Sequence, residues 1–219
     1  MTLRRQTLFA ILLLCALPML AQKQSRMATL FSNTPADLIP ALSQDLKVEL
    51  VKQYYTQEPT EKIRNVYGGP CRITKITDTY LRLELDSTMV VELKEFRSLL
   101  RPTRLAMGVT STIRPAISVL TFYDSEWTPI SGSSLVELPQ PEQFLINPAD
   151  STRLDYKKAL VERGTWDYAA SFDPDSPTLT FRITTFDEEM AAKQHPIVTS
   201  LLKDKITYRW KNNRFVPQP

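Results

Sequence analysis

Histidine is almost absent from this sequence, because His195 is the single one among 219 residues. Most zinc and iron sites need several histidines or cysteines, and histidine-based acid–base sites need a histidine in place, so most sites of these kinds are excluded. Glycine is also scarce, with 5 residues, and no glycine-rich phosphate loop or dinucleotide fingerprint is present. The two cysteines, Cys15 and Cys71, form no paired metal motif. We therefore expect no metal and no cofactor.

Long hydrophobic runs are also missing, except at the N-terminus. Two arginines precede an apolar run from Leu8 to Leu20, and the small residue Ala21 stands before Gln22. This arrangement is typical of a secretory signal peptide over residues 1–21, and the run is short for a membrane span of about 20 residues. We predict cleavage near Ala21/Gln22, export to the periplasm or the outer cell surface, and a flexible N-terminal segment over residues 22–30.

An excess of one charge is absent once the leader is removed. Of 27 basic residues, Arg4 and Arg5 leave with the leader, so 25 basic and 24 acidic residues remain. The chain has no block of five lysines or arginines, so nucleic acid is not an expected partner. No other apolar run approaches a membrane span, so the mature chain is expected to have none. Cys71 remains alone and has no intramolecular disulfide partner.

The residues that are present predict an α+β protein. Thr34 can cap a helix that has Pro35 at its first position, and we predict two short helices over residues 35–57. From Cys71 onward, apolar residues recur with a period of two, which is typical of half-buried strands. The predicted strands are Tyr80–Asp86, Met89–Phe96, Met107–Ile113 and Ile117–Tyr123. We expect an antiparallel sheet with the short helices packed on one face.

A proline-rich stretch over residues 139–152 predicts a boundary or a long connection. It divides the mature chain into a first α+β unit, 31–138, and a second α+β unit, 139–219. The second unit is predicted to hold helices over 152–162 and 187–194 and strands over 165–172, 179–184, 206–210 and 214–216. The two units form either tandem helix–helix–sheet units or one continuous domain.

Candidate catalytic residues are few. Cys71 and His195 could pair as nucleophile and base, but no surrounding motif supports this, and a lone cysteine is more often a small buried apolar residue. Asp124 and Glu126 flank a turn and could form an acidic pair, although solvated turn residues explain them as well. The acidic segment Asp173–Ser176 lacks the glycine and the distal glutamate of a calcium loop, and a hairpin turn explains it.

Aromatic residues are a stronger signal than the carboxylates. Phe122, Tyr123, Trp127, Tyr208 and Trp210 concentrate on predicted strands and their turns. Exposed rings would form a platform for a protein or a glycan, whereas buried rings would belong to the core. We expect most of them in the core.

Four of these turn and strand residues are nevertheless the best candidates for a binding surface. They are Tyr123, Asp124, Trp127 and Trp210.

Four short segments occur in a characteristic order: Phe31–Leu42 with its two prolines, Tyr80–Leu83, Ile117–Trp127 and Ile206–Trp210. In this order they resemble a Bacteroidales-restricted family of secreted proteins of unknown function. The resemblance covers the whole mature chain and implies a periplasmic or surface-exposed protein of Bacteroides-like bacteria. It carries no activity, ligand or catalytic residue. The two-unit arrangement is also similar, at the level of fold, to β-lactamase-inhibitor-like proteins.

The sequence therefore favours an exported, non-enzymatic binding or interaction module with an envelope protein or a glycan as partner. The alternative is a carboxylate-dependent hydrolase that acts on an envelope or glycan substrate. A polar pocket around a carboxyl group with a raised pKa would favour the hydrolase. An exposed aromatic or apolar patch would favour binding.

Overall fold

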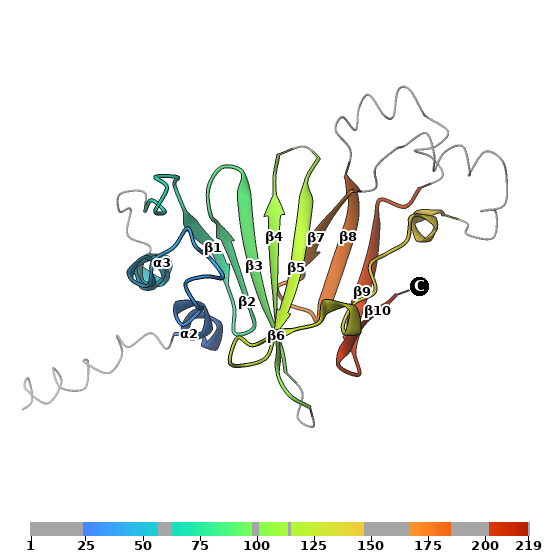
Figure 1. The fold of residues 1–219 in the computed structure, drawn as a ribbon, viewed down its shortest axis with the longest axis horizontal. Coiled ribbons are helices and arrows are strands. Elements are labelled where there is room, and N and C mark those ends of the chain that lie inside the picture. Colours follow the sequence, from blue (N-terminus) through green and yellow to red (C-terminus); the bar gives the residue numbers. More distant parts are fainter. Residues whose placement is uncertain are drawn as a thin grey trace, which may run out of the picture.

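The chain folds into three layers, which are a pair of helices, a six-stranded sheet and a four-stranded sheet (Figure 1). The computed structural model describes residues 24–56, 63–97, 101–113, 115–146, 167–184 and 202–218. Its helices are α2 (Arg26–Ser32) and α3 (Gln44–Thr56), with short 3-10 helices η2 (Gly132–Ser134) and η3 (Pro141–Phe144). Its strands are β1 (Arg72–Ile76), β2 (Tyr80–Glu84), β3 (Met89–Phe96), β4 (Arg104–Ser111), β5 (Ile117–Tyr123), β6 (Pro129–Ile130), β7 (Asp167–Phe172), β8 (Thr178–Thr184), β9 (Lys205–Lys211) and β10 (Arg214–Pro217).

The first sheet is an antiparallel meander in the order β1-β2-β3-β4-β5-β6. Short turns produce this order, because strands joined by a few residues usually pair with their neighbours in the chain. The turn after β2 is fixed by Asp86, whose Oδ1 accepts hydrogen bonds from the backbone N–H (2.6 Å) and the hydroxyl (2.7 Å) of Thr88. β3 and β4 pair along their whole length, whereas β6 pairs only with Phe122 and Tyr123 of β5.

Successive residues of a strand point to opposite sides, so the first sheet has two apolar faces. Val91 and Leu93 of β3 join the core beneath the helices. Phe96 of β3 and Ala106 of β4 join a second core beneath the four-stranded sheet. β3 is therefore covered on both sides, and every residue from Val90 to Phe96 is buried.

The helices cover the part of the first sheet formed by β1, β2 and β3 (Figure 1). Ser25 begins α2, because its Oγ accepts a hydrogen bond from the backbone N–H of Ala28 (3.2 Å). Lys47 of α3 is fully buried, and its Nζ donates a hydrogen bond to the carbonyl oxygen of Thr34 (2.6 Å). Burial lowers the pKa of Lys47, and Asp37 opposes this shift. The ammonium group thus joins α3 to the turn that follows α2.

The second sheet is also an antiparallel meander, in the order β10-β9-β8-β7, and β7 lies against the first sheet. Ser118 of β5 joins the two sheets, since its Oγ accepts a hydrogen bond from the Ala170 N–H (2.8 Å) and donates one to the Ala170 carbonyl oxygen (3.3 Å). Lys94 of β3 makes a second link, because its Nζ donates to the carbonyl oxygens of Asp173 (2.8 Å) and Pro174 (3.0 Å). Backbone groups of β7 and of the turn that follows it are thereby satisfied by side chains of the first sheet.

The predicted α+β class is confirmed, with antiparallel sheets and short helices on one face of the first sheet. The strands over residues 89–96 and 117–123 begin and end where the alternation predicts. The first helix differs from the prediction, because it spans residues 26–32 and lies largely within the segment predicted to be flexible, 22–30. The reason is that Met27 and Phe31 are buried in the helix-side core, and this burial orders the segment.

Several predictions concern other parts of the chain. The helices predicted over residues 152–162 and 187–194, together with His195, lie outside the described residues. The predicted boundary between residues 138 and 139 follows η2, and in chain order it separates the strands of the first sheet from those of the second. Within the described ranges, no helix has the length and apolar character that a membrane crossing requires.

Candidate binding surfaces

The four residues named as a candidate binding surface lie in two places, because Tyr123, Asp124 and Trp127 meet at the end of β5 and Trp210 lies elsewhere. Tyr123 is buried in the helix-side core, and the ring of Trp127 packs against it with ring centroids 5.6 Å apart. Trp210 belongs to the other face of the sheet, where it stacks on Phe96 at 4.5 Å. The aromatic residues therefore divide between two cores and leave no common aromatic platform.

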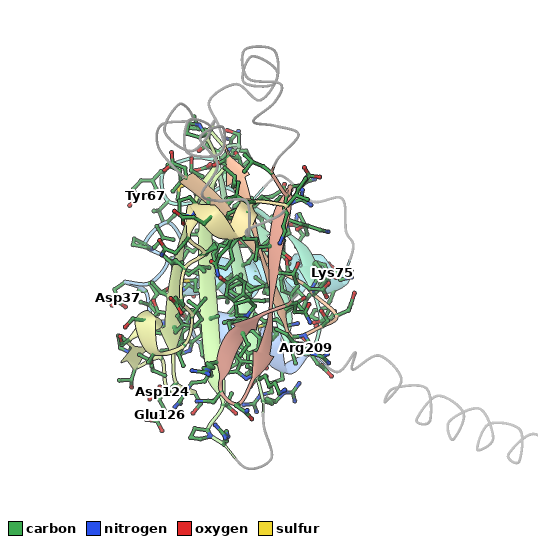
Figure 2. The ribbon with its side chains drawn as sticks, turned by 90° about the vertical axis from the view of Figure 1, so that its right-hand side faces the viewer. Asp37, Tyr67, Lys75, Asp124, Glu126 and Arg209 are labelled. Carbon is green, nitrogen blue, oxygen red and sulfur yellow. The ribbon has the colours of Figure 1, made fainter. Side chains whose placement is uncertain are left out.

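Asp124 has a local role in the turn after β5. Its Oδ1 accepts hydrogen bonds from the backbone N–H groups of Glu126 and Thr128, both at 2.9 Å. The bond from Thr128 is the main reason why the pKa of Asp124 lies below its usual range. Figure 2 shows Asp124 and Glu126 close to each other at the lower end of the molecule. Asp124 and Glu126 therefore belong to a solvated turn, which is one of the two interpretations that the sequence offered for them.

Cys71 has the environment of a structural cysteine. The residue is buried, and its Sγ lies 3.6 Å from the carbonyl oxygen of Ile63. Burial raises the pKa of the thiol to about 11, so the reactive thiolate is scarce at neutral pH. The negative charge of Glu49 raises the pKa of the thiol further, so this neighbour also disfavours the thiolate.

One carboxyl group of the described residues has a raised pKa, and it is buried within the fold. Glu92 of β3 is buried between the two sheets, where its Oε1 accepts hydrogen bonds from the hydroxyl of Tyr80 (2.5 Å) and from Arg82 (3.2 Å). Burial raises the pKa of Glu92, and the hydrogen bond from Tyr80 opposes this shift. Because both oxygens are enclosed, the group serves the core and gives no support to a hydrolytic site. The described part of the chain holds no group of three or more side chains able to bind a metal.

An aliphatic surface lies where the helix layer ends. It is formed by Val109 of β4 and by Ile117 and Val119 of β5, and we call it the β4–β5 face. Val119 is 61% exposed and stands directly opposite Val109, which is half-buried against the helix-side core. The surface is thus a continuation of the apolar sheet face that α2 and α3 cover elsewhere.

The alternation of residues 117–123 predicted which side chains share this face. No residue pattern indicates that the helices stop short of this face, so the exposure of Ile117 and Val119 was not predicted. This exposure depends on the placement of two helices that are distant in the chain.

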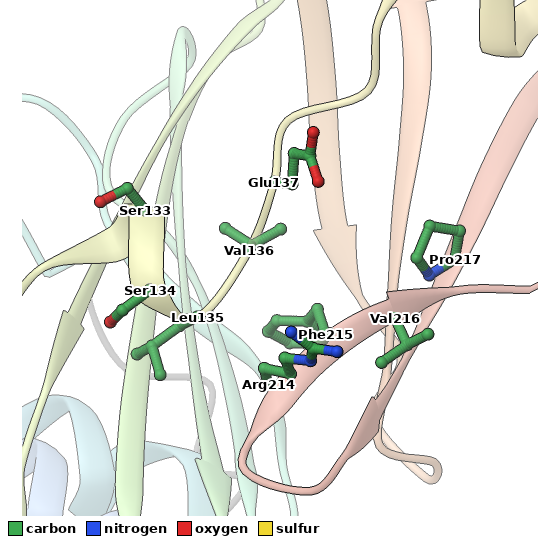
Figure 3. A pocket seen from close by; sticks show the side chains of 9 residues that line it. All are labelled: Ser133, Ser134, Leu135, Val136, Glu137, Arg214, Phe215, Val216 and Pro217. Atoms are coloured by element: carbon green, nitrogen blue, oxygen red, sulfur yellow. The ribbon is translucent and has the colours of Figure 1, made fainter.

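A small crevice lies at the edge of β10 (Figure 3). Its volume is about 200 Å³, and it lies between the segment that follows η2 and strand β10. The lining residues are Ser133, Ser134, Leu135, Val136, Glu137, Arg214, Phe215, Val216 and Pro217. No motif predicts this crevice, because its two walls are far apart in the sequence.

The fold and the surfaces define the class of protein, which is a two-sheet α+β protein with helices on one face. It has an exposed aliphatic face and a small crevice. The described residues form no recognisable catalytic centre. The chain belongs to the family described as "Protein of unknown function (DUF3256)", whose model matches residues 19–215. This confirms the resemblance to a family of unknown function.

One solved structure has a similar fold. It is the structure of a domain of an uncharacterized protein from Porphyromonas gingivalis W83, with a TM-score of 0.74 and 20% sequence identity. The alignment covers 89% of this chain and 100% of that chain, and at this identity it shows a shared fold. Among curated proteins, none matches the chain significantly.

Proposed function

We propose that the chain is an exported, non-enzymatic interaction module that binds a protein of the bacterial envelope through the β4–β5 face. The observation that carries this proposal is the exposure of Val119 and Ile117, at 61% and 44%, beside the half-buried Val109. Adjacent aliphatic side chains on a rigid sheet lose little entropy on binding and gain from removal from water. Contiguous exposed apolar residues of this kind mark sites of protein interaction.

The aliphatic character of the face favours a protein over a glycan. Sugars are commonly held by the flat faces of aromatic rings, whereas aliphatic side chains suit the apolar side chains of another protein. Tyr123 is buried, and Trp210 is stacked on Phe96, so these rings are engaged within the fold. The exposed ring of Tyr67 stands apart, on the loop before β1 and at the upper end in Figure 2.

A matched pair of variants tests the face directly. Val119→Lys places a charge in the β4–β5 face, and Val48→Lys places the same charge on α3, where the valine is 52% exposed. Each tagged protein is expressed in its native host, crosslinked in the cell, purified by affinity and analysed by mass spectrometry. We expect Val119→Lys to reduce recovery of the specific partner about tenfold or more, because a buried unpaired charge weakens an interface. Val48→Lys is expected to retain the partner.

Three results would contradict the proposal. The first is equal recovery of the partner with both variants, and the second is the absence of a stoichiometric partner from correctly exported protein. The third is a second copy of this chain as the species lost in Val119→Lys, which would make the face a dimer interface. Thermal unfolding of each variant shows that any loss comes from the surface and not from the fold.

Export is the second part of the proposal, and the leader over residues 1–21 supports it. We expect the protein recovered from the envelope fraction to begin at Gln22, as measured by mass spectrometry of its N-terminal peptide. The variant Ala21→Arg should leave the leader attached, because cleavage needs a small residue at this position. Recovery of native protein that begins at Met1, or its retention in the cytoplasm, would contradict export.

A further inference from the structure

We propose that the crevice between residues 133–137 and β10 binds a short peptide of about two residues whose amino and carboxyl termini are both free. This site is separate from the β4–β5 face, and the inference does not depend on the proposed partner. Three properties of the crevice support it: a strand edge with an available carbonyl group, two opposite charges at its ends, and a small apolar floor.

The strand edge follows from the β9–β10 hairpin. Asn212 and Asn213 both have positive φ, at 54° and 65°, and Lys211 pairs with Arg214, which describes a two-residue turn. In such a hairpin the closing pair is hydrogen-bonded, so the next residue along the strand directs its N–H and C=O away from its partner. Phe215 follows this pattern, because its N–H donates to the carbonyl oxygen of Leu135 (2.7 Å).

The carbonyl group of Phe215 therefore also points toward the segment that follows η2. Among the described residues it accepts no hydrogen bond. An extended peptide can donate an N–H to this oxygen in the way that a strand adds to the edge of a sheet. Pro217 lacks an N–H and ends the available edge, so only a short guest can pair here.

The two charged side chains of the crevice lie at opposite ends of it, as Figure 3 shows for Glu137 and Arg214. Neither makes a hydrogen bond or an ion pair with another residue of the described ranges. A guanidinium group suits a carboxylate, to which it can donate two hydrogen bonds, and a carboxylate suits an ammonium group. A zwitterionic ligand complements both ends at once.

The floor between the charges is apolar and limits the size of the ligand. Leu135, Val136 and Phe215 are buried residues that line the opening. Its volume of about 200 Å³ is below the range of about 300–1,000 Å³ that is usual for drug-sized ligands. A dipeptide with small apolar side chains meets all three conditions. The hydroxyl group of Ser134 donates its hydrogen bond to the carbonyl oxygen of Ser131 (2.7 Å), so it does not donate one to the ligand.

The test is a titration of ¹⁵N-labelled protein, produced with its own leader and purified, with the dipeptide Ala-Val. We expect saturable chemical-shift changes confined to the amides of residues 133–137 and 214–216. The same dipeptide with an acetylated N-terminus and an amidated C-terminus should bind at least about tenfold more weakly, since it lacks both charges. Arg214→Gln and Glu137→Gln should each weaken binding of the free dipeptide by about tenfold.

Arg209→Gln is the matched control, because Arg209 lies on the neighbouring strand β9, is exposed, and does not line the crevice. It removes the same charge and should leave the affinity unchanged. An equal loss with Arg209→Gln shows general charge attraction and overturns the proposal. Absence of saturable shifts, shifts elsewhere in the protein, or equal binding of the blocked dipeptide also overturns it. The partner-capture experiment with Val119→Lys is unaffected by any of these results.

Discussion

Replacing Phe172 by alanine is expected to lower the free energy of unfolding by about 3–5 kcal/mol, which is the usual cost of deleting a buried phenyl ring. Phe172 is the last residue of β7, and its ring packs between the two sheets. It contacts the rings of Phe96 (centroids 6.2 Å apart) and Phe215 (6.4 Å apart). A Cβ built on Gly108 of β4 would lie 3.4 Å from this ring, so the first sheet approaches it closely. No neighbouring side chain can fill the space without moving a strand.

Urea denaturation of the purified variants measures this effect. Ser171→Ala is the control, because Ser171 is the adjacent residue of β7 and is exposed. It should change the free energy of unfolding by less than about 0.5 kcal/mol. A loss below about 1 kcal/mol for Phe172→Ala would show that the second sheet contributes little to the stability of the first.

Lys47→Ala is expected to cost about 3 kcal/mol, because it removes a fully buried side chain and leaves the carbonyl oxygen of Thr34 without its donor. Lys47→Met separates the two causes, since methionine keeps most of the stem and loses the ammonium group. About 1–3 kcal/mol of the loss should remain in the methionine variant. Lys52→Ala, an exposed position on the same helix, should be nearly neutral. A neutral Lys47→Ala would contradict the structural role of the buried ammonium group.

The same residue predicts a dependence on pH. Burial places the pKa of Lys47 below the ordinary 10.5 of an unfolded chain. Between these two values the unfolded chain binds more protons than the folded chain, so the free energy of unfolding rises with pH. The cost of burying the ammonium group is present at neutral pH and is relieved as the pH approaches 10.5. The native chain should therefore gain stability relative to Lys47→Met over this interval, and a constant difference would contradict the shift.

The strands were predictable because their alternation is local. Leu81 and Leu83 alternate with charged residues, and both are fully buried beneath the helices. Ile117 and Val119 also share one face of their strand but are exposed, because coverage of a sheet face depends on where distant helices lie. The pattern of side chains can thus predict a sheet but not which part of it remains open.

Lys47 shows a second limit of sequence reasoning. Leu50 and Val51 of α3 are buried as apolar residues usually are, whereas a lysine is ordinarily expected to be exposed. Its partner is the backbone carbonyl group of Thr34 in the turn after α2, and the types of the residues do not indicate such a backbone partner. The peptide crevice was unpredictable for the same reason, since Phe215 contributes a backbone carbonyl and Glu137 comes from a distant segment.

The double coverage of β3 has a consequence for dynamics. Local fluctuations expose the backbone of edge strands and loops, but a strand enclosed by helices on one side and by a second sheet on the other can open only when both layers separate. The amides from Val90 to Phe96 should therefore exchange their hydrogens with solvent only through global unfolding. Their exchange rates in the intact protein then report the stability of the whole fold, without any denaturant.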